Sequence, residues 1–126
     1  LFINDAYNAA PTSVRAALNF VENATMRRDK WVVLGDMLEL GTLEREYHEN
    51  IADDLNVEAI HHVCLFGPRM EALYAKLQGK VDVIWSADDY APIIEKLEAE
   101  ASADSLVLLK GSRGMALENV LNAFVK

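Results

Sequence analysis

The sequence predicts an α/β fold in which a doubly wound, mostly parallel sheet carries helices on both faces. Segments with the apolar pattern of strands and segments with the pattern of amphipathic helices alternate five times along 126 residues. Two strand-like runs, Trp31–Leu34 and Leu106–Leu109, are continuously apolar, which is typical of strands covered on both faces. The length suits one packed core, so we expect a single domain over residues 1–126.

Five strands are expected where short apolar runs stand between turn signals: residues 1–4, 31–35, 60–66, 81–85 and 105–110. Helices are expected between and after them, because apolar residues recur there at helical spacing. Thr42 is a candidate N-cap for the second helix, and Ser86-Ala87-Asp88-Asp89 resembles a capping box for the fourth. The order of the strands in the sheet cannot be read from these patterns.

The composition excludes several classes of function. A formal net charge of −8 argues against nucleic acid or an anionic membrane as the main partner. No apolar run approaches the ~18 residues of a membrane span, and no signal peptide is visible. The single cysteine, Cys64, lies in an apolar run, so we expect a buried thiol. These features fit the cytoplasm. Because Leu1 lies at once in a strand-like run, we expect the chain to be a piece of a longer protein.

Ligands of α/β domains bind at the carboxyl ends of the strands, so the loops that follow the predicted strands are candidate sites. The first of these loops carries Asp5, Tyr7 and Asn8. The Asp5 carboxylate can accept hydrogen bonds from two hydroxyls, as a ribose diol requires. Tyr7 offers a flat ring and a phenol, and Asn8 an amide. The alternative is an Asx-type turn ahead of a helix that begins at Pro11.

The loop after the second strand, Gly35–Gly41, places Asp36 and Glu39 between two glycines that permit a tight turn. Either acid could hold the ammonium group of an amino acid or a peptide. Alternatively, these acids cap the next helix or pair with Arg45.

The loop after the fifth strand, Lys110–Gly114, favours an anion site. Backbone N–H groups at the start of a helix attract anions, and Lys110 and Arg113 add positive charge. Arg113 can grip a carboxylate with two parallel hydrogen bonds, so the C-terminus of a dipeptide would suit this loop, as would a phosphate. The alternative is a pair of solvated charges at the end of a strand.

Three segments resemble motifs of the Mur ligase family. Asp5-Ala6-Tyr7-Asn8-Ala9-Ala10-Pro11 is similar to the Asp-x-Tyr-Asn-Ala-Asn-Pro motif that opens the family's C-terminal domain. Gly35–Gly41 resembles a Gly-Asp-Met-x-Glu-Leu-Gly loop, and Leu109–Arg113 resembles a Val-Lys-Gly-Ser-Arg segment. The three segments follow the family's order. Ala10 and Asn4 depart from it, since the family more often has Asn and Asp at these positions.

The resemblance implies a Rossmann-like sheet, with one antiparallel strand allowed, and the C-terminal domain of a ligase that joins D-alanyl-D-alanine to UDP-N-acetylmuramoyl-tripeptide. It implies that ATP is bound by Asp5, Tyr7 and Asn8, and that the dipeptide is seated by Asp36, Lys110, Ser112 and Arg113. ATP and Mg²⁺ would be held mainly by a central domain outside this chain. We therefore expect the isolated domain to be inactive.

The sequence lacks both common phosphate-binding signatures, Gly-x-x-x-x-Gly-Lys-Ser/Thr and Gly-x-Gly-x-x-Gly, in keeping with a triphosphate held elsewhere. No metal centre is expected, since adjacent His61 and His62 would point to opposite faces of a strand. Two alternatives are a phospho-receiver signalling domain and a stand-alone nucleotide-binding module. A receiver needs an acceptor Asp at the end of its third strand, where this sequence reads Cys64–Pro68 with no carboxylate.

Overall fold

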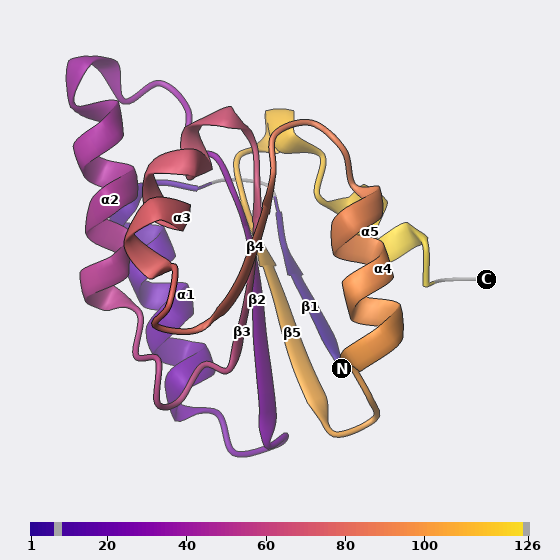
Figure 1. The fold of residues 1–126 in the computed structure, drawn as a ribbon. Coiled ribbons are helices and arrows are strands. Elements are labelled where there is room, and N and C mark those ends of the chain that lie inside the picture. The colour runs from indigo at the N-terminus through magenta and orange to yellow at the C-terminus, as the bar shows by residue number, and fades with distance from the viewer. Residues whose placement is uncertain (7–8, 125–126) are drawn as a thin grey trace.

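The computed structural model describes residues 1–6 and 9–124, which form one five-stranded sheet between two layers of helices (Figure 1). All five strands are parallel, and they lie in the order β1-β5-β2-β3-β4. Their bounds are β1 Phe2–Asp5, β2 Asp29–Gly35, β3 His62–Phe66, β4 Asp82–Ser86 and β5 Ser105–Lys110. The predicted α/β fold is confirmed. The antiparallel strand that the resemblance allowed is not among the strands of the described residues.

The helices are divided between the two faces of the sheet (Figure 1). One face carries α1 (Pro11–Asn23), α2 (Glu44–Asp54) and α3 (Glu71–Leu77), and the other carries α4 (Ala91–Glu100) and α5 (Glu118–Asn122). Three single 3₁₀ turns precede helices: η1 (Gly41–Leu43), η2 (Pro68–Met70) and η3 (Arg113–Met115). The face changes because the chain steps from β1 through β4 in one direction and then returns to β5, and crossovers between parallel strands keep one hand.

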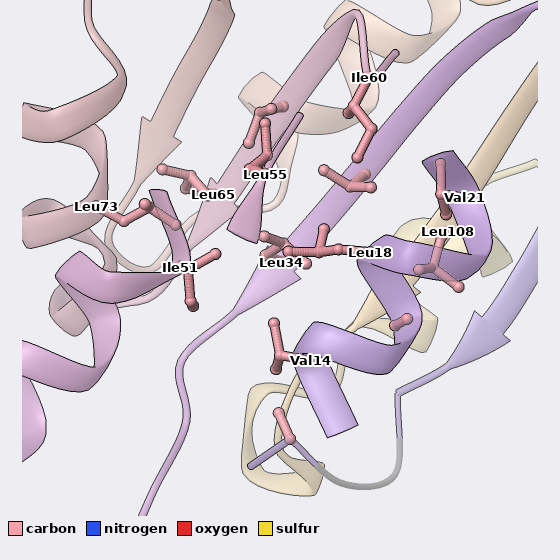
Figure 2. Close-up of a cluster of buried hydrophobic side chains, with 14 of the residues drawn as sticks. Val14, Leu18, Val21, Leu34, Ile51, Leu55, Ile60, Leu65, Leu73 and Leu108 are labelled. Atoms are coloured by element: carbon pink, nitrogen blue, oxygen red, sulfur yellow. The ribbon is translucent and has the colours of Figure 1, made fainter. Parts of the chain in front are cut away.

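Alternate residues of the central strands feed two separate cores. In β2, Val32 and Leu34 pack toward α1, α2 and α3, whereas Trp31 and Val33 pack toward α4 and α5. Figure 2 shows the first core, in which Leu34 of β2 lies in one cluster with side chains of β3, β5 and the three helices. This two-sided burial is the physical reason for the continuously apolar strands.

Two predicted helix starts are wrong. α2 begins at Glu44 after η1, and the residue before it is Leu43, so Thr42 is not its N-cap. α4 begins at Ala91, five residues after Ser86, which is the last residue of β4. The Ser86 hydroxyl instead closes a turn with the backbone of Asp89.

No helix of the described residues is long and apolar enough to cross a membrane.

Candidate functional site

At the carboxyl edge of the sheet, the connections that follow β5 and its two neighbouring strands leave toward opposite faces. After β1 and β2 the chain turns toward the face of α1 and α2, but after β5, which lies between them, it turns toward α5 (Figure 1). Such a switch point opens a crevice between neighbouring loops, and ligands of doubly wound folds bind there. The three motif segments of the sequence follow β1, β2 and β5, so the fold brings all three to this edge.

Asp5 and Lys110 form an ion pair at the switch point. They are register neighbours at the ends of β1 and β5, and the Lys110 Nζ donates to Asp5 Oδ2 over 2.8 Å. The side chain of Lys110 is 5% exposed and that of Asp5 is 50% exposed. The sequence assigned Asp5 to ATP and Lys110 to the dipeptide, and the structure joins these two residues in one contact.

A surface groove of about 530 Å³ lies beside this pair, between β1 and α1. Its walls are mostly apolar, with Phe20 and Leu108 among them, and its polar groups include Asn4 and Ser13. Tyr7 and Asn8, the other residues predicted to bind ATP, lie outside the described residues.

Asp36, directly after β2, is fully buried, and backbone groups of a neighbouring loop surround its carboxylate. Oδ2 accepts from the Arg69 N–H over 3.1 Å and Oδ1 accepts from the Met70 N–H over 3.0 Å. The Arg69 guanidinium also donates to Oδ2 over 3.3 Å. Asp36 therefore caps η2, the turn that follows β3. The Arg45 suggested as its partner instead pairs with Glu49, and the exposed Glu39 has a left-handed backbone with φ of 62°.

Burial raises the pKa of Asp36 above its ordinary value. The hydrogen bonds from Arg69 and the positive charge of its guanidinium lower this pKa, but by less than burial raises it. A carboxylate kept in this position thus costs free energy of desolvation, which its donors only partly repay.

The buried carboxylate of Asp36 explains why the residue at position 67 is a glycine. A Cβ at this position would lie 2.4 Å from the Asp36 Cγ, and the φ of Gly67 is +112°, a conformation that side chains rarely adopt. The sequence pair Gly67-Pro68 is therefore more than a turn signal, because it makes room for a side chain from another loop.

Ser112, in the loop after β5, joins that loop to the loop after β2. Its N–H donates to the Asp36 carbonyl over 3.2 Å, and its hydroxyl accepts from the Leu38 N–H over 3.1 Å. Ser112 is buried, whereas Arg113 beside it is exposed. Of the two cations predicted in this loop, Arg113 faces solvent and Lys110 is held by Asp5.

Sequence reasoning missed two residues of this edge, Arg69 and His48. The Arg69 side chain bridges Asp36 and Glu44, and it is 37% exposed. His48 is fully buried; its Nε2 accepts from the Met37 N–H, so the proton lies on Nδ1, which donates to the Glu44 carbonyl. No local signal marks either residue, because the partners that tie them to this edge, Asp36 for Arg69 and Met37 for His48, lie 33 and 11 positions away.

The amino edge of the sheet carries a separate charged cluster. His62 lies between Asp82 and Asp29, with nitrogen–oxygen distances of 2.7 and 3.0 Å. In the described part of the chain, one trio could converge on a metal ion, namely His62, Asp82 and Glu100. The ammonium group of Lys96 already bonds both acids of that trio, so a cation is built into the cluster.

Comparison with known families and proteins agrees with this geometry. The family described as Mur ligase, glutamate ligase domain, matches residues 1–113. A UDP-N-acetylmuramoyl-tripeptide–D-alanyl-D-alanine ligase of Bacillus subtilis is 35% identical over 98% of this chain. A ligase of the same name from Treponema pallidum is 33% identical over 94% of it. The chain spans 28% and 26% of the lengths of these two relatives.

Solved structures give the same result. A MurF ligase of Thermotoga maritima in complex with ADP has a TM-score of 0.81 and 27% identity, covering 98% of this chain and 27% of that one. A MurF of Acinetobacter baumannii has a TM-score of 0.80 and 28% identity, covering 97% of this chain and 27% of that one. A domain of a Haemophilus ducreyi protein, at 15% identity, shares the fold, with a TM-score of 0.69, and this chain covers 87% of it. By its sequence match and its fold, this chain belongs to the Mur ligase family.

Proposed function

We propose that this chain is the C-terminal domain of a longer cytoplasmic ligase that joins D-alanyl-D-alanine to UDP-N-acetylmuramoyl-tripeptide with ATP. The relatives from Bacillus subtilis and Treponema pallidum bear the name of that activity. The observation that carries the proposal is the meeting of the three motif segments at one edge, through the Asp5–Lys110 and Asp36–Ser112 contacts. The cytoplasm is where ATP and a UDP-linked substrate would both be at hand.

The proposed ATP half-site is built on Asp5, with Tyr7 and Asn8. The Asp5 carboxylate is half exposed and has one oxygen, Oδ1, outside its bond to Lys110, so it can accept from a ribose hydroxyl. The ammonium group of Lys110 holds that carboxylate in place through its bond to Oδ2. The Thermotoga maritima ligase, of which this chain covers 27%, was solved in complex with ADP, which supports a nucleotide as a ligand of the full-length protein.

The two acids predicted in this site, Asp5 and Asp36, do not fit Mg²⁺. A magnesium ion takes one or two carboxylates in open positions, but the Asp5 carboxylate lies 2.8 Å from the ammonium group of Lys110, which repels a cation, and Asp36 is buried under backbone donors. We therefore propose that the metal and the triphosphate are held by other domains of the ligase, and we assign this chain no step in that part of the reaction.

The proposed dipeptide half-site lies on the loop after β5. The exposed guanidinium of Arg113 can take the terminal carboxylate of D-alanyl-D-alanine in a two-bonded grip, beside Ser112. Lys110 contributes positive charge from a buried position, and Asp36 supports the loop through its carbonyl.

In the proposed reaction, a carboxylate oxygen of the tripeptide attacks the γ-phosphorus of ATP, giving an acyl phosphate and ADP. The dipeptide amine then attacks the acyl carbon, an amide forms, and phosphate and a proton leave. The chain's contribution is to hold the two small substrates in line and to cover the acyl phosphate against water. No side chain of the described residues needs to react covalently.

Titration of the ¹⁵N-labelled chain by NMR tests the two half-sites. D-alanyl-D-alanine is expected to shift amides of Gly111–Arg113 and Gly35–Glu39, and ATP to shift those around Asp5. Arg113→Ala is expected to abolish the dipeptide response, while Arg28→Ala, an exposed arginine at the other edge of the sheet, leaves it intact. Ligand-induced shifts confined to other regions would contradict the assignment.

A further inference from the structure

Three of the five loops at the carboxyl edge are joined through one short segment, Asp36–Leu38. The Asp36 carboxylate accepts from the loop after β3, and its carbonyl accepts from the loop after β5 at Ser112. The Leu38 N–H donates back to the Ser112 hydroxyl. Each of these two loops therefore donates one hydrogen bond to the other, although their residues are about 75 positions apart in the sequence.

The segment is also tied to the sheet and to α2. The Asp36 N–H donates to the Phe66 carbonyl over 3.1 Å, and the Met37 N–H donates to His48 over 3.0 Å. Because these groups are buried and all have partners, a displacement of one loop would break hydrogen bonds in the others. Buried polar networks of this kind select one arrangement of the chain.

Two arginines border this network. Arg69 is gripped by Asp36 on one side and by Glu44 on the other, and its side chain remains partly exposed. Arg113 follows the buried Ser112 directly and is exposed. The network thus determines where the loops present both guanidinium groups.

We infer that Asp36 is a positioning residue, the buried joint that holds the loops after β3 and β5 in register so that Arg69 and Arg113 face the substrate. This inference rests on the proposed function and assigns Asp36 an indirect role within the dipeptide half-site. It also adds Arg69 as a residue that the joint places.

The first test needs no substrate and uses the chain itself, which builds two cores of its own and whose fold has been crystallised as a separate domain in the Haemophilus ducreyi protein. Asp36→Asn keeps one oxygen as an acceptor but turns an amide NH₂ toward donors. Its amide spectrum is expected to change at Arg69 and Met70 and also at Leu38 and Ser112. The exposed Asp53→Asn on α2 is the matched control and changes neither group.

Ser112→Ala is the reciprocal variant, and it decides the question if Asp36→Asn does not fold. It removes the acceptor of the Leu38 N–H at the far end of the network, and the amides of Arg69 and Met70 are expected to shift in response. Shifts confined to residues next to each substitution would overturn the inference, because the loops would then be independent.

The second test measures dipeptide saturation in the full-length ligase. Asp36→Asn and Ser112→Ala are each expected to raise the KM for D-alanyl-D-alanine about tenfold, and the double variant to raise it no further than either alone. If Asp36 and Ser112 only stabilised the fold, the variants would lower the amount of folded enzyme and leave KM unchanged. If the two residues acted independently, the KM increase of the double variant would be the product of the two single increases. If the wild-type ligase does not use the dipeptide at all, the proposed function is wrong. The amide shifts of the first test still show whether Asp36 joins the loops, because they need no substrate.

Discussion

At the scale of single residues, the two acids of the carboxyl edge show how environment separates roles. Asp5 is half exposed and forms an ion pair with Lys110 through Oδ2, so Oδ1 remains for a ligand. Asp36 is fully buried, and backbone N–H groups of the next loop occupy both of its oxygens. The same residue type is therefore proposed to contact the ligand in one case, and it supports the loops in the other.

The close approach of Gly67 to Asp36 yields the first prediction. Gly67→Ala adds a Cβ at 2.4 Å from a buried carboxyl carbon and forces a side chain into a φ of +112°. We expect a loss of unfolding free energy on the order of 3 kcal/mol, from strain and overpacking together. Urea unfolding measures it. Gly79→Ala is the matched control, since its φ is +79° but nothing lies within 4 Å, and a loss as large there would contradict the role of Asp36.

The Asp5–Lys110 pair predicts an unequal cost for its two deletions. Asp5→Ala leaves a buried ammonium group without its partner, and we expect a loss of about 2–3 kcal/mol in the free energy of unfolding. Lys110→Met removes the buried charge and leaves Asp5 half in water, so we expect a loss of about 1 kcal/mol or less. Equal losses in chemical denaturation would show that the ammonium group is hydrated.

Cys64 is buried in β3, as the apolar run around it predicts. Burial raises the pKa of its thiol to about 12, so the reactive thiolate is scarce near neutral pH.

At the scale of the elements, each end of the sheet has its own charged network. The carboxyl ends hold the loops of the candidate site. The amino ends of β2, β3 and β4 hold Asp29, His62 and Asp82 in a row, with His62 stacked on Trp31 at 4.1 Å between ring centroids. Both ring nitrogens of His62 therefore lie within hydrogen-bond distance of carboxylate oxygens, one on each neighbouring strand.

This amino-end network predicts how stability depends on pH. Burial alone would raise the pKa of Asp29, but hydrogen bonds from Ser105, Trp31 and His62 outweigh it and lower the pKa below 3.8. The folded state therefore binds the Asp29 proton less tightly than the unfolded state does. That stabilisation is complete above pH 3.8 and is lost as the pH falls through the lower folded value.

Urea unfolding at a series of pH values measures the effect. We expect the free energy of unfolding to fall below about pH 4, and to fall less steeply in Asp29→Asn. Asp53→Asn serves as the control, since its exposed carboxyl has no hydrogen-bond partner among the described contacts. An equally steep decline in Asp29→Asn would assign the acid sensitivity to other groups. Asp36 works with the opposite sign, because its raised pKa favours the folded state as the pH falls toward 3.8.

At the scale of the whole molecule, the candidate site is an edge rather than an enclosed pocket. The chain spans about a quarter of the length of its named relatives, its sequence has neither common phosphate-binding signature, and the predicted site acid Asp5 is paired with Lys110. Membership of the Mur ligase family gives no support to the receiver domain or the stand-alone module as alternatives. In the proposed full-length ligase, this edge forms one wall of a cleft between domains.

The 126-residue chain is therefore expected to show no ATP-dependent ligation by itself. In the full-length ligase, the same assay is expected to yield the D-alanyl-D-alanine adduct with release of phosphate. Arg113→Ala should lower kcat/KM for the dipeptide by about 10²-fold, because a charge-assisted bond to a carboxylate contributes about 1.5–3 kcal/mol. Phosphate release by the isolated chain that depends on tripeptide and dipeptide would refute the division of labour between domains.

The amino-acid sequence by itself determined the alternation of strands and helices, the position of all five strands to within a few residues, and the family. These features are local: an apolar run, a helical stripe or a motif is visible within a window of a few turns. Thr42 and Ser86 do not start the helices as predicted, because Thr42 lies inside η1 and Ser86 is the last residue of β4.

Only the tertiary structure decided which of the predicted polar residues meet. The strand order places β5 between β1 and β2, and this alone pairs Asp5 with Lys110 and sets Ser112 against Asp36. The burial of Asp36 and its grip on Arg69 depend on a loop 33 positions away. No sequence window contains such contacts, because they arise when separate strands are brought into register and the loops between them are packed.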